Sequence, residues 1–233
     1  MKVFAISDLH LSTNCPKPMD IFGPVWTNYL ESIEADWNQK VTEDDIVLIP
    51  GDISWAMKWE DSFPDLEYIS KFKGHKILLR GNHDYWWKSI SELRNHLPSK
   101  MYAIQNDALR IGNYVICGTR GWTVPEYSHK SEADEKIYKR EVLRLQLSLD
   151  HMTKIKQEGD TVIACMHFPP FNSKLEVSDF TNLFEEYGVN KVVFGHLHSY
   201  DKKQQLAVNL NGIDYYLTSC DLVDNKLVEI CGE

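Results

Sequence analysis

Short apolar runs rich in Val, Ile and Leu recur along the chain, and they constrain the fold more than any other feature. Near-continuous runs of this kind are typical of strands buried on both faces of a sheet. Segments of helical period lie between some of them, and this alternation predicts an α/β sandwich. The runs before residue 195 span 3–6, 46–49, 76–79, 114–117, 161–166 and 191–194.

The clearest expected helix follows Ser131, with Asp134 three residues later as a plausible cap. Its apolar residues recur at spacings of four and three as far as Met152, and Gly159 ends it. We interpret this stripe as core packing, because a coiled coil would need a longer repeat. Weaker helical patterns cover 25–40, 65–72 and 91–97.

Turn residues indicate where strands pair with their sequence neighbours. The pairs at 106–107 and 112–113 predict a hairpin inserted midway along the chain. After Gly195 the pattern becomes β, with expected strands over 205–210, 215–219 and 227–230. We find no internal repeat and no Pro/Gly/Ser linker, so we expect one domain spanning residues 1–233.

Charge and hydropathy restrict the partners. The chain of 233 residues is 43% hydrophobic and 25% charged, as expected of a globular protein, and its formal net charge is −9. An acidic chain repels a phosphate backbone, so stable nucleic-acid binding is not expected. No stretch reaches the roughly 18 apolar residues that span a bilayer, and Asp8 and His10 interrupt the apolar N-terminus where a signal peptide would continue. The sequence therefore predicts a cytoplasmic protein without a membrane partner.

Side chains that suit metal ions stand directly after the apolar runs. A single Asp at such a place is usually a turn former, and a single His is usually a surface or core residue. Five of the nine histidines nevertheless fall at these strand ends. Ligands bind beyond the carboxyl ends of strands in open α/β sheets, so we expect one shared site. Its expected members are Asp8, His10, Asp52, Asn82, His167, His196 and His198.

The blocks that contain these residues resemble the ordered motifs of the calcineurin-like metallophosphoesterase superfamily. They are Asp8-Leu9-His10, Gly51-Asp52, Gly81-Asn82-His83-Asp84, His167 and Gly195-His196-Leu197-His198. They follow the family's order from residue 8 to residue 198, so the resemblance covers nearly the whole chain. It implies a four-layer α/β/β/α sandwich of two mixed β-sheets, with two metal ions at the carboxyl edge.

The resemblance also assigns the ligands. It implies that Asp8, His10, Asp52 and His198 bind a first divalent ion, that Asp52, Asn82, His167 and His196 bind a second, and that Asp52 bridges the two. Mixed carboxylate, imidazole and amide donors suit Mn²⁺ first, with Fe or Zn²⁺ as alternatives. Two such ions activate a shared water and clamp the phosphate, so the expected nucleophile is metal-bound hydroxide.

Three further residues are candidates for catalysis. His83 resembles the family's catalytic histidine, which would protonate the departing oxygen. Asp84 has two possible roles at this point. It could orient or tune His83, or it could hold the turn in place. Arg120 is a candidate phosphate contact, as is Arg80, because a guanidinium group matches phosphate oxygens; pairing with a carboxylate is the alternative.

The second motif narrows the function. Protein Ser/Thr phosphatases of this superfamily carry a second Asp and an Arg three and four residues after the Asp of this motif, whereas Trp55 and Ala56 stand at those positions here. We therefore expect a phosphodiesterase or small-molecule phosphatase. The alternatives are a nuclease and a non-catalytic metal-binding scaffold of the same fold.

Tryptophans close behind the motifs bear on the substrate. They could stack the base of a nucleotide substrate, or they could pack loops around the metal centre. They are Trp55, Trp59, Trp86, Trp87 and Trp122. Natural substrate and oligomeric state stay open at this point.

Overall fold

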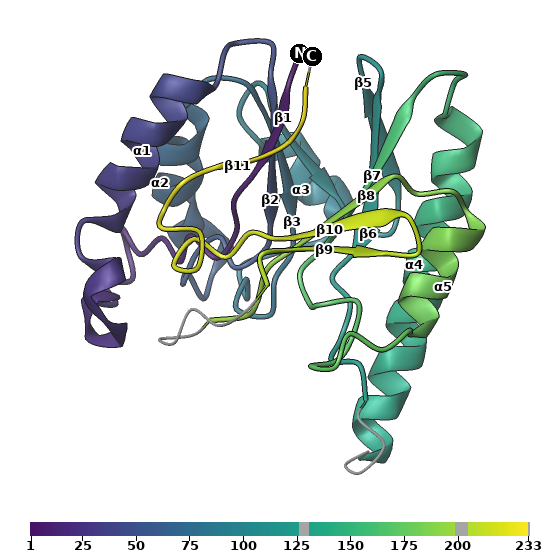
Figure 1. Cartoon of the computed structure of the whole chain (residues 1–233). Coiled ribbons are helices and arrows are strands. Elements are labelled where there is room, and N and C mark those ends of the chain that lie inside the picture. The colour runs from purple at the N-terminus through teal and green to yellow at the C-terminus, as the bar shows by residue number, and fades with distance from the viewer. Residues whose placement is uncertain (126–130, 199–204, 233) are drawn as a thin grey trace.

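The computed structural model describes residues 1–125, 131–198 and 205–232, and Figure 1 shows its elements. The strands are β1 (Val3–Ala5), β2 (Ile46–Pro50), β3 (His75–Leu79), β4 (Met101–Ile104), β5 (Ala108–Ile111), β6 (Tyr114–Thr119), β7 (Thr161–Met166), β8 (Lys191–Phe194), β9 (Ala207–Leu210), β10 (Ile213–Leu217) and β11 (Val228–Cys231). The helices are α1 (Tyr29–Lys40), α2 (Trp59–Ser70), α3 (Ile90–His96), α4 (Glu132–Ile155) and α5 (Asp179–Glu186), with short 3-10 helices at Asp20–Phe22 and Pro24–Trp26.

The strands form two mixed sheets. One has the order β11-β1-β2-β3-β4, and the other has the order β5-β6-β7-β8-β10-β9. Strands β1 to β4 run parallel, and so do β6, β7, β8 and β10. Three strands pair antiparallel: β11 with β1, β5 with β6, and β9 with β10. The carboxyl ends of the parallel strands in each sheet therefore point to one edge.

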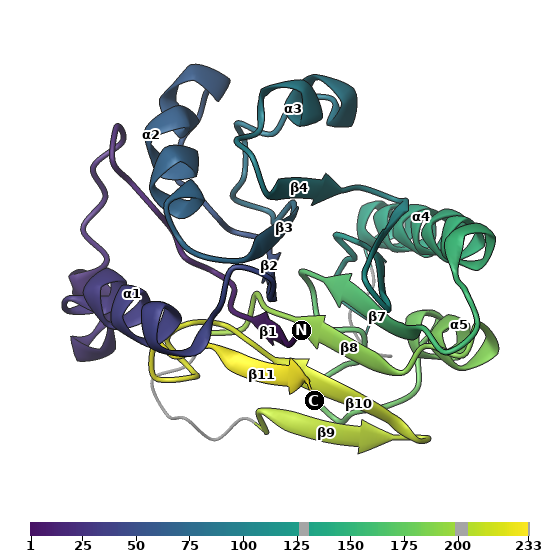
Figure 2. The ribbon, with the colours of Figure 1, turned by 90° about the horizontal axis from the view of Figure 1, so that it is seen from above.

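Alternating side chains on the central strands build the layers. On β1, Phe4 packs with helices α1 to α3, whereas Val3 and Ala5 pack against the other sheet. A second apolar layer lies between the other sheet and helices α4 and α5. Figure 2 shows α1, α2 and α3 on one side of the paired sheets and α4 and α5 on the other. This α/β/β/α sandwich confirms the predicted fold class.

The prediction missed two short elements and the starts of two helices. Strand β4 has only four residues, and α5 has only eight, although a capping box of Ser178 and Thr181 marks its start. The helix expected over 25–40 begins at Tyr29 because residues 24–26 form a 3-10 helix. Helix α2 begins at Trp59, before its internal Pro64.

Two further sequence predictions, the hairpin and the helix cap, agree with the structure. Strands β5 and β6 form the expected hairpin, and Ser131 caps α4 by accepting a hydrogen bond from the Asp134 backbone N–H at 3.1 Å. Within the described residues, no helix combines the length and the apolar character that a membrane crossing requires.

Candidate metal centre

Four of the seven expected ligands lie in left-handed backbone at strand ends. The φ angles are 59° at Asp8, 47° at His10, 51° at Asp52 and 71° at His196. Non-glycine residues seldom adopt this conformation, and it costs about 1 to 3 kcal/mol where the surroundings enforce it. The chain therefore turns sharply after β1, β2 and β8 at the positions that aim these side chains toward one another.

Two glycines let the neighbouring loops approach closely. A Cβ atom at Gly81 would overlap the side chain and backbone of Asp52, and one at Gly195 would overlap Ser7 and the carboxylate of Asp8. The Gly-Asn-His and Gly-His blocks therefore need glycine for contact between loops, because no larger residue fits there.

The first group of donors consists of Asp8, His10 and His198, whose ligand atoms all lie within 4.8 Å of one another. Asp8 and His10 are buried, while His198 reaches the surface. The Nδ1 N–H of His198 donates to Asp221 at 2.9 Å, which leaves Nε2 facing the Asp8 carboxylate at 3.6 Å. In the neutral ring this arrangement selects the tautomer whose free lone pair points into the group. Burial acts to lower the pKa of His198, but Asp221 and Asp8 outweigh it and raise that pKa to about 10, so a bound cation would take the place of a proton on Nε2.

The second group consists of Asp52, His167 and His196, again with ligand atoms within 4.8 Å of one another. Asn82 joins it, because its Oδ1 lies 2.7 Å from Nε2 of His167. The Nδ1 N–H of His167 donates to the Pro50 carbonyl at 2.9 Å, so Nε2 points into the group. The structure thus brings all seven expected ligands into two groups.

Asp52 lies between the two groups. Its Oδ2 atom is 3.9 Å from Nε2 of His10 in the first group and 3.5 Å from Nε2 of His167 in the second. Its Oδ1 atom accepts a hydrogen bond from the His83 backbone N–H at 2.8 Å. One carboxylate oxygen therefore faces both sets of imidazoles.

The electrostatics of the groups favour added positive charge. Burial disfavours ionised Asp8, yet the charges of the nearby imidazoles hold the pKa of Asp8 below its usual value. Burial lowers the pKa of His10 and that of His196 to about 4, which keeps both rings neutral with a lone pair for a ligand bond. Burial also acts to lower the pKa of His167, but the charge of Asp52 outweighs it and raises that pKa to about 9.

Two lone pairs meet in the second group. Because Nδ1 of His167 donates to a carbonyl, neutral His167 has a lone pair on Nε2 that faces the Asn82 oxygen at 2.7 Å. These acceptors repel unless a proton or a cation lies between them.

In the first group, the buried Nδ1 of His10 has no hydrogen-bond partner among the described residues.

The spacing of the donors also fits cations. Donors that each lie about 2.1 Å from one ion are about 3 to 4 Å apart, and the imidazole–carboxylate separations of 3.5 to 3.9 Å fall in that range. They are too long for hydrogen bonds. The donor set of imidazole, carboxylate and amide oxygen therefore fits divalent first-row ions.

Comparison with known families decides the identity of the fold. The sequence profile of the calcineurin-like phosphoesterases matches residues 1–200. The chain belongs to this family. The match places it among metal-dependent phosphoesterases, which are hydrolases, and it agrees with the two groups of donors.

Two solved structures share the fold of this calcineurin-like phosphoesterase. Phosphopantetheinyl hydrolase from Mycobacterium tuberculosis aligns over 100% of this chain and 96% of its own, with 13% identity and a TM-score of 0.57. The protein TT1561 of Thermus thermophilus aligns over 97% of this chain and 96% of its own, with 13% identity and a TM-score of 0.59. At these identities the likeness is one of fold alone. Among curated proteins, none matches this phosphoesterase.

His83 lies beside the donor groups of the phosphoesterase without belonging to either. Its half-buried ring is 5.8 Å from the ring of His10 and 4.6 Å from that of Trp55. Burial lowers the pKa of His83. The side chain lines a pocket of about 550 Å³ together with Lys17 and Tyr85, so it faces a space in which an ester group could lie.

Lys17 and Asp221 are two residues near the donor groups that were not predicted from the sequence. The Lys17 ammonium group lies 3.1 Å from the centre of the Trp55 ring, on which the ring of His10 also stacks. Asp221 orients His198. The position of each residue in the sequence could have identified it as a candidate. Lys17 lies in the loop after the first motif, and Asp221 lies just beyond the carboxyl end of β10.

The contacts of Asp84 favour the structural role. Its buried carboxylate accepts hydrogen bonds from the backbone N–H groups of Ile53, Ser54 and Gly81 and from the Trp86 indole. Burial and the charge of Asp52 raise the pKa of Asp84 to about 6. These bonds join the loops that carry Asp52 and Asn82, and a direct action on His83 stays a prediction.

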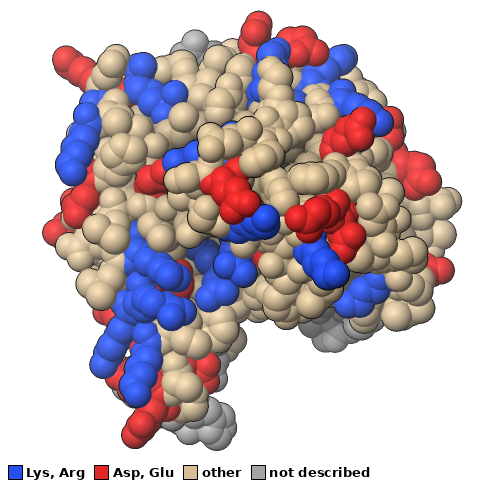
Figure 3. Space-filling model, turned by 180° about the vertical axis from the view of Figure 1, so that it is seen from behind, with Lys and Arg blue, Asp and Glu red and all other residues tan. Residues whose placement is uncertain are grey.

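Arg120 lies by a carboxylate. Its guanidinium group is 3.8 Å from buried Glu141, which also pairs with Arg144 at 2.6 Å and lies 3.9 Å from Arg140. Figure 3 shows Lys and Arg gathered on the part of the rear face where α4 lies. The backbone carbonyl of Arg120 accepts from the His167 N–H at 3.1 Å, so this residue does position the second group. Phosphate contact by Arg120 stays a prediction.

Arg80 follows β3, the strand that leads to the Gly-Asn-His block. Its Nε atom is buried without a hydrogen-bond partner in the described part of the chain. The carboxylate pairing considered as the alternative for this residue is thus not seen at Nε. Phosphate contact by Arg80 also stays a prediction.

The five tryptophans divide between the core and the site. Trp59, Trp86 and Trp87 are buried in the layer beneath helices α1 to α3, as expected of loop packing. Trp122 is half-buried beside the layer under α4 and α5. Trp55 is half-buried and lies at the first group, where its ring stacks on His10 at 4.5 Å.

Replacing Asp221 by asparagine is expected to weaken binding of metal to the first group. The variant loses the charge that holds the Nδ1 proton of His198, and changes of this kind typically reduce metal affinity about 10- to 100-fold. Titration of the apo-protein with Mn²⁺ measures the change. Asp214→Asn, at an exposed carboxylate paired with Lys191, is the matched control. An unchanged affinity in Asp221→Asn would mean that Asp221 does not support the site.

Proposed function

We propose that this chain is a dinuclear metal-dependent enzyme that hydrolyses phosphodiesters or small-molecule phosphate esters rather than phosphoproteins. The observation that carries the proposal is the position of Asp52, whose Oδ2 atom faces His10 and His167 from the two donor groups. Such a carboxylate can bridge two cations. The name of one fold neighbour, a phosphopantetheinyl hydrolase, is consistent with hydrolysis.

We assign the first ion to Asp8, His10, Asp52 and His198, and the second to Asp52, Asn82, His167 and His196. When bound, the two cations would supply a water of lowered pKa and would offset the negative charge of the phosphate. Mn²⁺ is the preferred ion, with Fe or Zn²⁺ as alternatives, because the donors mix imidazole nitrogen with oxygen.

Other side chains orient the ligands and supply a proton. Asp221 and the Pro50 carbonyl hold the Nδ1 protons of His198 and His167, so both rings present Nε2 to the site. His83 stands outside the donor groups, where we assign it to protonating the departing oxygen. The substrate is not a phosphoprotein in this proposal because Trp55 and Ala56 stand where protein phosphatases carry the second Asp and the Arg of this motif.

A pair of assays tests this function. The purified protein loaded with Mn²⁺ is expected to release p-nitrophenolate from bis(p-nitrophenyl) phosphate and to leave single-stranded DNA intact. Rapid cleavage of DNA would instead identify a nuclease, and a lack of turnover with either substrate would favour the metal-binding scaffold. A panel of phosphorylated metabolites then separates diesters from monoesters.

A further inference from the structure

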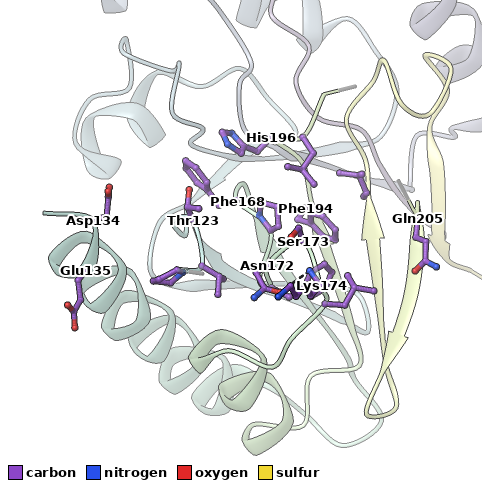
Figure 4. A pocket seen from close by; sticks show the side chains of 17 residues that line it. Thr123, Asp134, Glu135, Phe168, Asn172, Ser173, Lys174, Phe194, His196 and Gln205 are labelled. Carbon is purple, nitrogen blue, oxygen red and sulfur yellow. Dashed lines mark hydrogen bonds between the residues drawn. The ribbon is translucent and has the colours of Figure 1, made fainter. Parts of the chain in front are cut away.

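A large pocket adjoins the second donor group and is not used by the chemistry described above. It has a volume of about 880 Å³, which is within the range of small-molecule sites. Figure 4 shows His196 at one end of it, with Phe168 next to it and Phe194 deeper in the pocket. The rings of His196 and Phe168 are 4.0 Å apart, so the pocket begins at a candidate metal ligand.

The floor of this pocket is apolar and fixed. Phe171, Phe194 and Leu217 line it while being at most 7% exposed, because they also belong to the core under α4 and α5. The rings of Phe171 and Phe194 pack edge to face at 82°. The edge of one ring therefore covers a face of the other, and because both side chains are nearly fully buried, a flat base entering the pocket would find little ring surface there on which to stack.

The wall formed by residues 168–178 is held in place by its own hydrogen bonds. The side-chain oxygen of Asn172 accepts from the backbone N–H groups of Lys174 and Glu176 at 3.0 and 3.1 Å. Leu175 lines the pocket from left-handed backbone, with φ at 58°. The Ser178 hydroxyl donates to the Pro170 carbonyl. The pocket is thus formed before a ligand arrives.

The charges in the lining do not suit a second phosphate. Among the described residues that line the pocket, Lys174 is the lone Lys or Arg, and it is exposed. Asp134 and Glu135 also line it, near the start of α4, but both are already engaged. Asp134 binds the hydroxyl of Ser131 and the indole of Trp122, and Glu135 pairs with Lys139 at 2.8 Å. An uncharged group is therefore the better occupant.

We propose that this pocket binds a flexible apolar chain carried by the phosphate ester, so that the substrates are esters with an alkyl or acyl-bearing arm. The inference rests on the proposed function, because it places the phosphate at the donor groups. Each methylene that leaves water for such a pocket raises affinity about three- to fourfold. The arm would give affinity and specificity, while the metal groups act on the phosphate.

The test uses p-nitrophenyl methyl, butyl and octyl phosphate with the Mn²⁺-loaded protein. We expect kcat/KM to rise about three- to fourfold for each early methylene, and calorimetry to show octyl phosphate binding at least tenfold tighter than methyl phosphate. Leu175→Asn should remove most of this gain while sparing the methyl ester, since asparagine tolerates left-handed backbone. Leu143→Asn, at a 62% exposed leucine of α4, is the matched control and should behave as the wild type.

The outcomes separate the two proposals. Equal rates on all three esters, with equal binding of the two phosphates, would overturn the pocket assignment and leave the phosphoesterase function intact. An absence of turnover would count against the proposed function, and calorimetry would then still decide the pocket. A preference for thymidine 5′-(p-nitrophenyl) phosphate over the octyl ester would show a base-binding pocket and would also overturn the inference.

Discussion

Asp52→Asn is expected to lose at least one of the two metal ions and nearly all activity. The substitution keeps the volume of the side chain but removes the charge that would offset two cations, at an oxygen 3.9 Å from Nε2 of His10 and 3.5 Å from Nε2 of His167. Elemental analysis of the purified variant measures the metal content, and bis(p-nitrophenyl) phosphate measures the activity.

The fold of this variant should persist. The amide oxygen of asparagine can still accept the hydrogen bond from the His83 backbone N–H, which is 2.8 Å long in the native chain. Circular dichroism checks this point, and Asp214→Asn again serves as a control because its exposed carboxylate pairs with Lys191 away from the site. Two tightly bound ions per chain in Asp52→Asn would remove Asp52 from the bridging role.

The convergence of the candidate ligands could be predicted from the sequence because strand ends are visible in a one-dimensional pattern. Asp8, Asp52, His167 and His196 each follow an apolar run closely, and the parallel order of the strands brings those ends to one edge. The strained backbone at three of these four residues could not be predicted in the same way, since it depends on neighbouring loops that meet only in the folded chain.

Residues that act through another side chain were harder to predict. Asp221 is separated from His198 by 23 positions, and only the packing of β10 beside β8 brings them together. The two roles left open for Asp84 could not be separated from sequence, because its partners include Ile53 and Ser54, which lie about thirty residues earlier. The apolar pocket could not be predicted from the sequence either, because its lining residues come from several loops that meet only in the folded chain.

His83→Ala is expected to keep both metal ions while slowing turnover about 10²- to 10⁴-fold on esters with poor leaving groups. The ring lies outside both donor groups and faces a pocket of about 550 Å³ beside Lys17 and Trp55, so its loss should not empty the metal sites. Elemental analysis and kcat measured on an alkyl phosphate ester check the two halves of the prediction. His96→Ala, at an exposed histidine of α3, is the matched control.

The size of the loss should depend on the leaving group, because p-nitrophenolate departs without a proton whereas an alkoxide does not. If His83 donates the proton, His83→Ala should lose much less of its kcat on a p-nitrophenyl ester than on an alkyl ester. Equal losses on the two esters would instead assign His83 to holding the phosphate. Loss of metal from the variant would place this ring among the ligands, next to Asn82, and would require the donor groups to be redrawn.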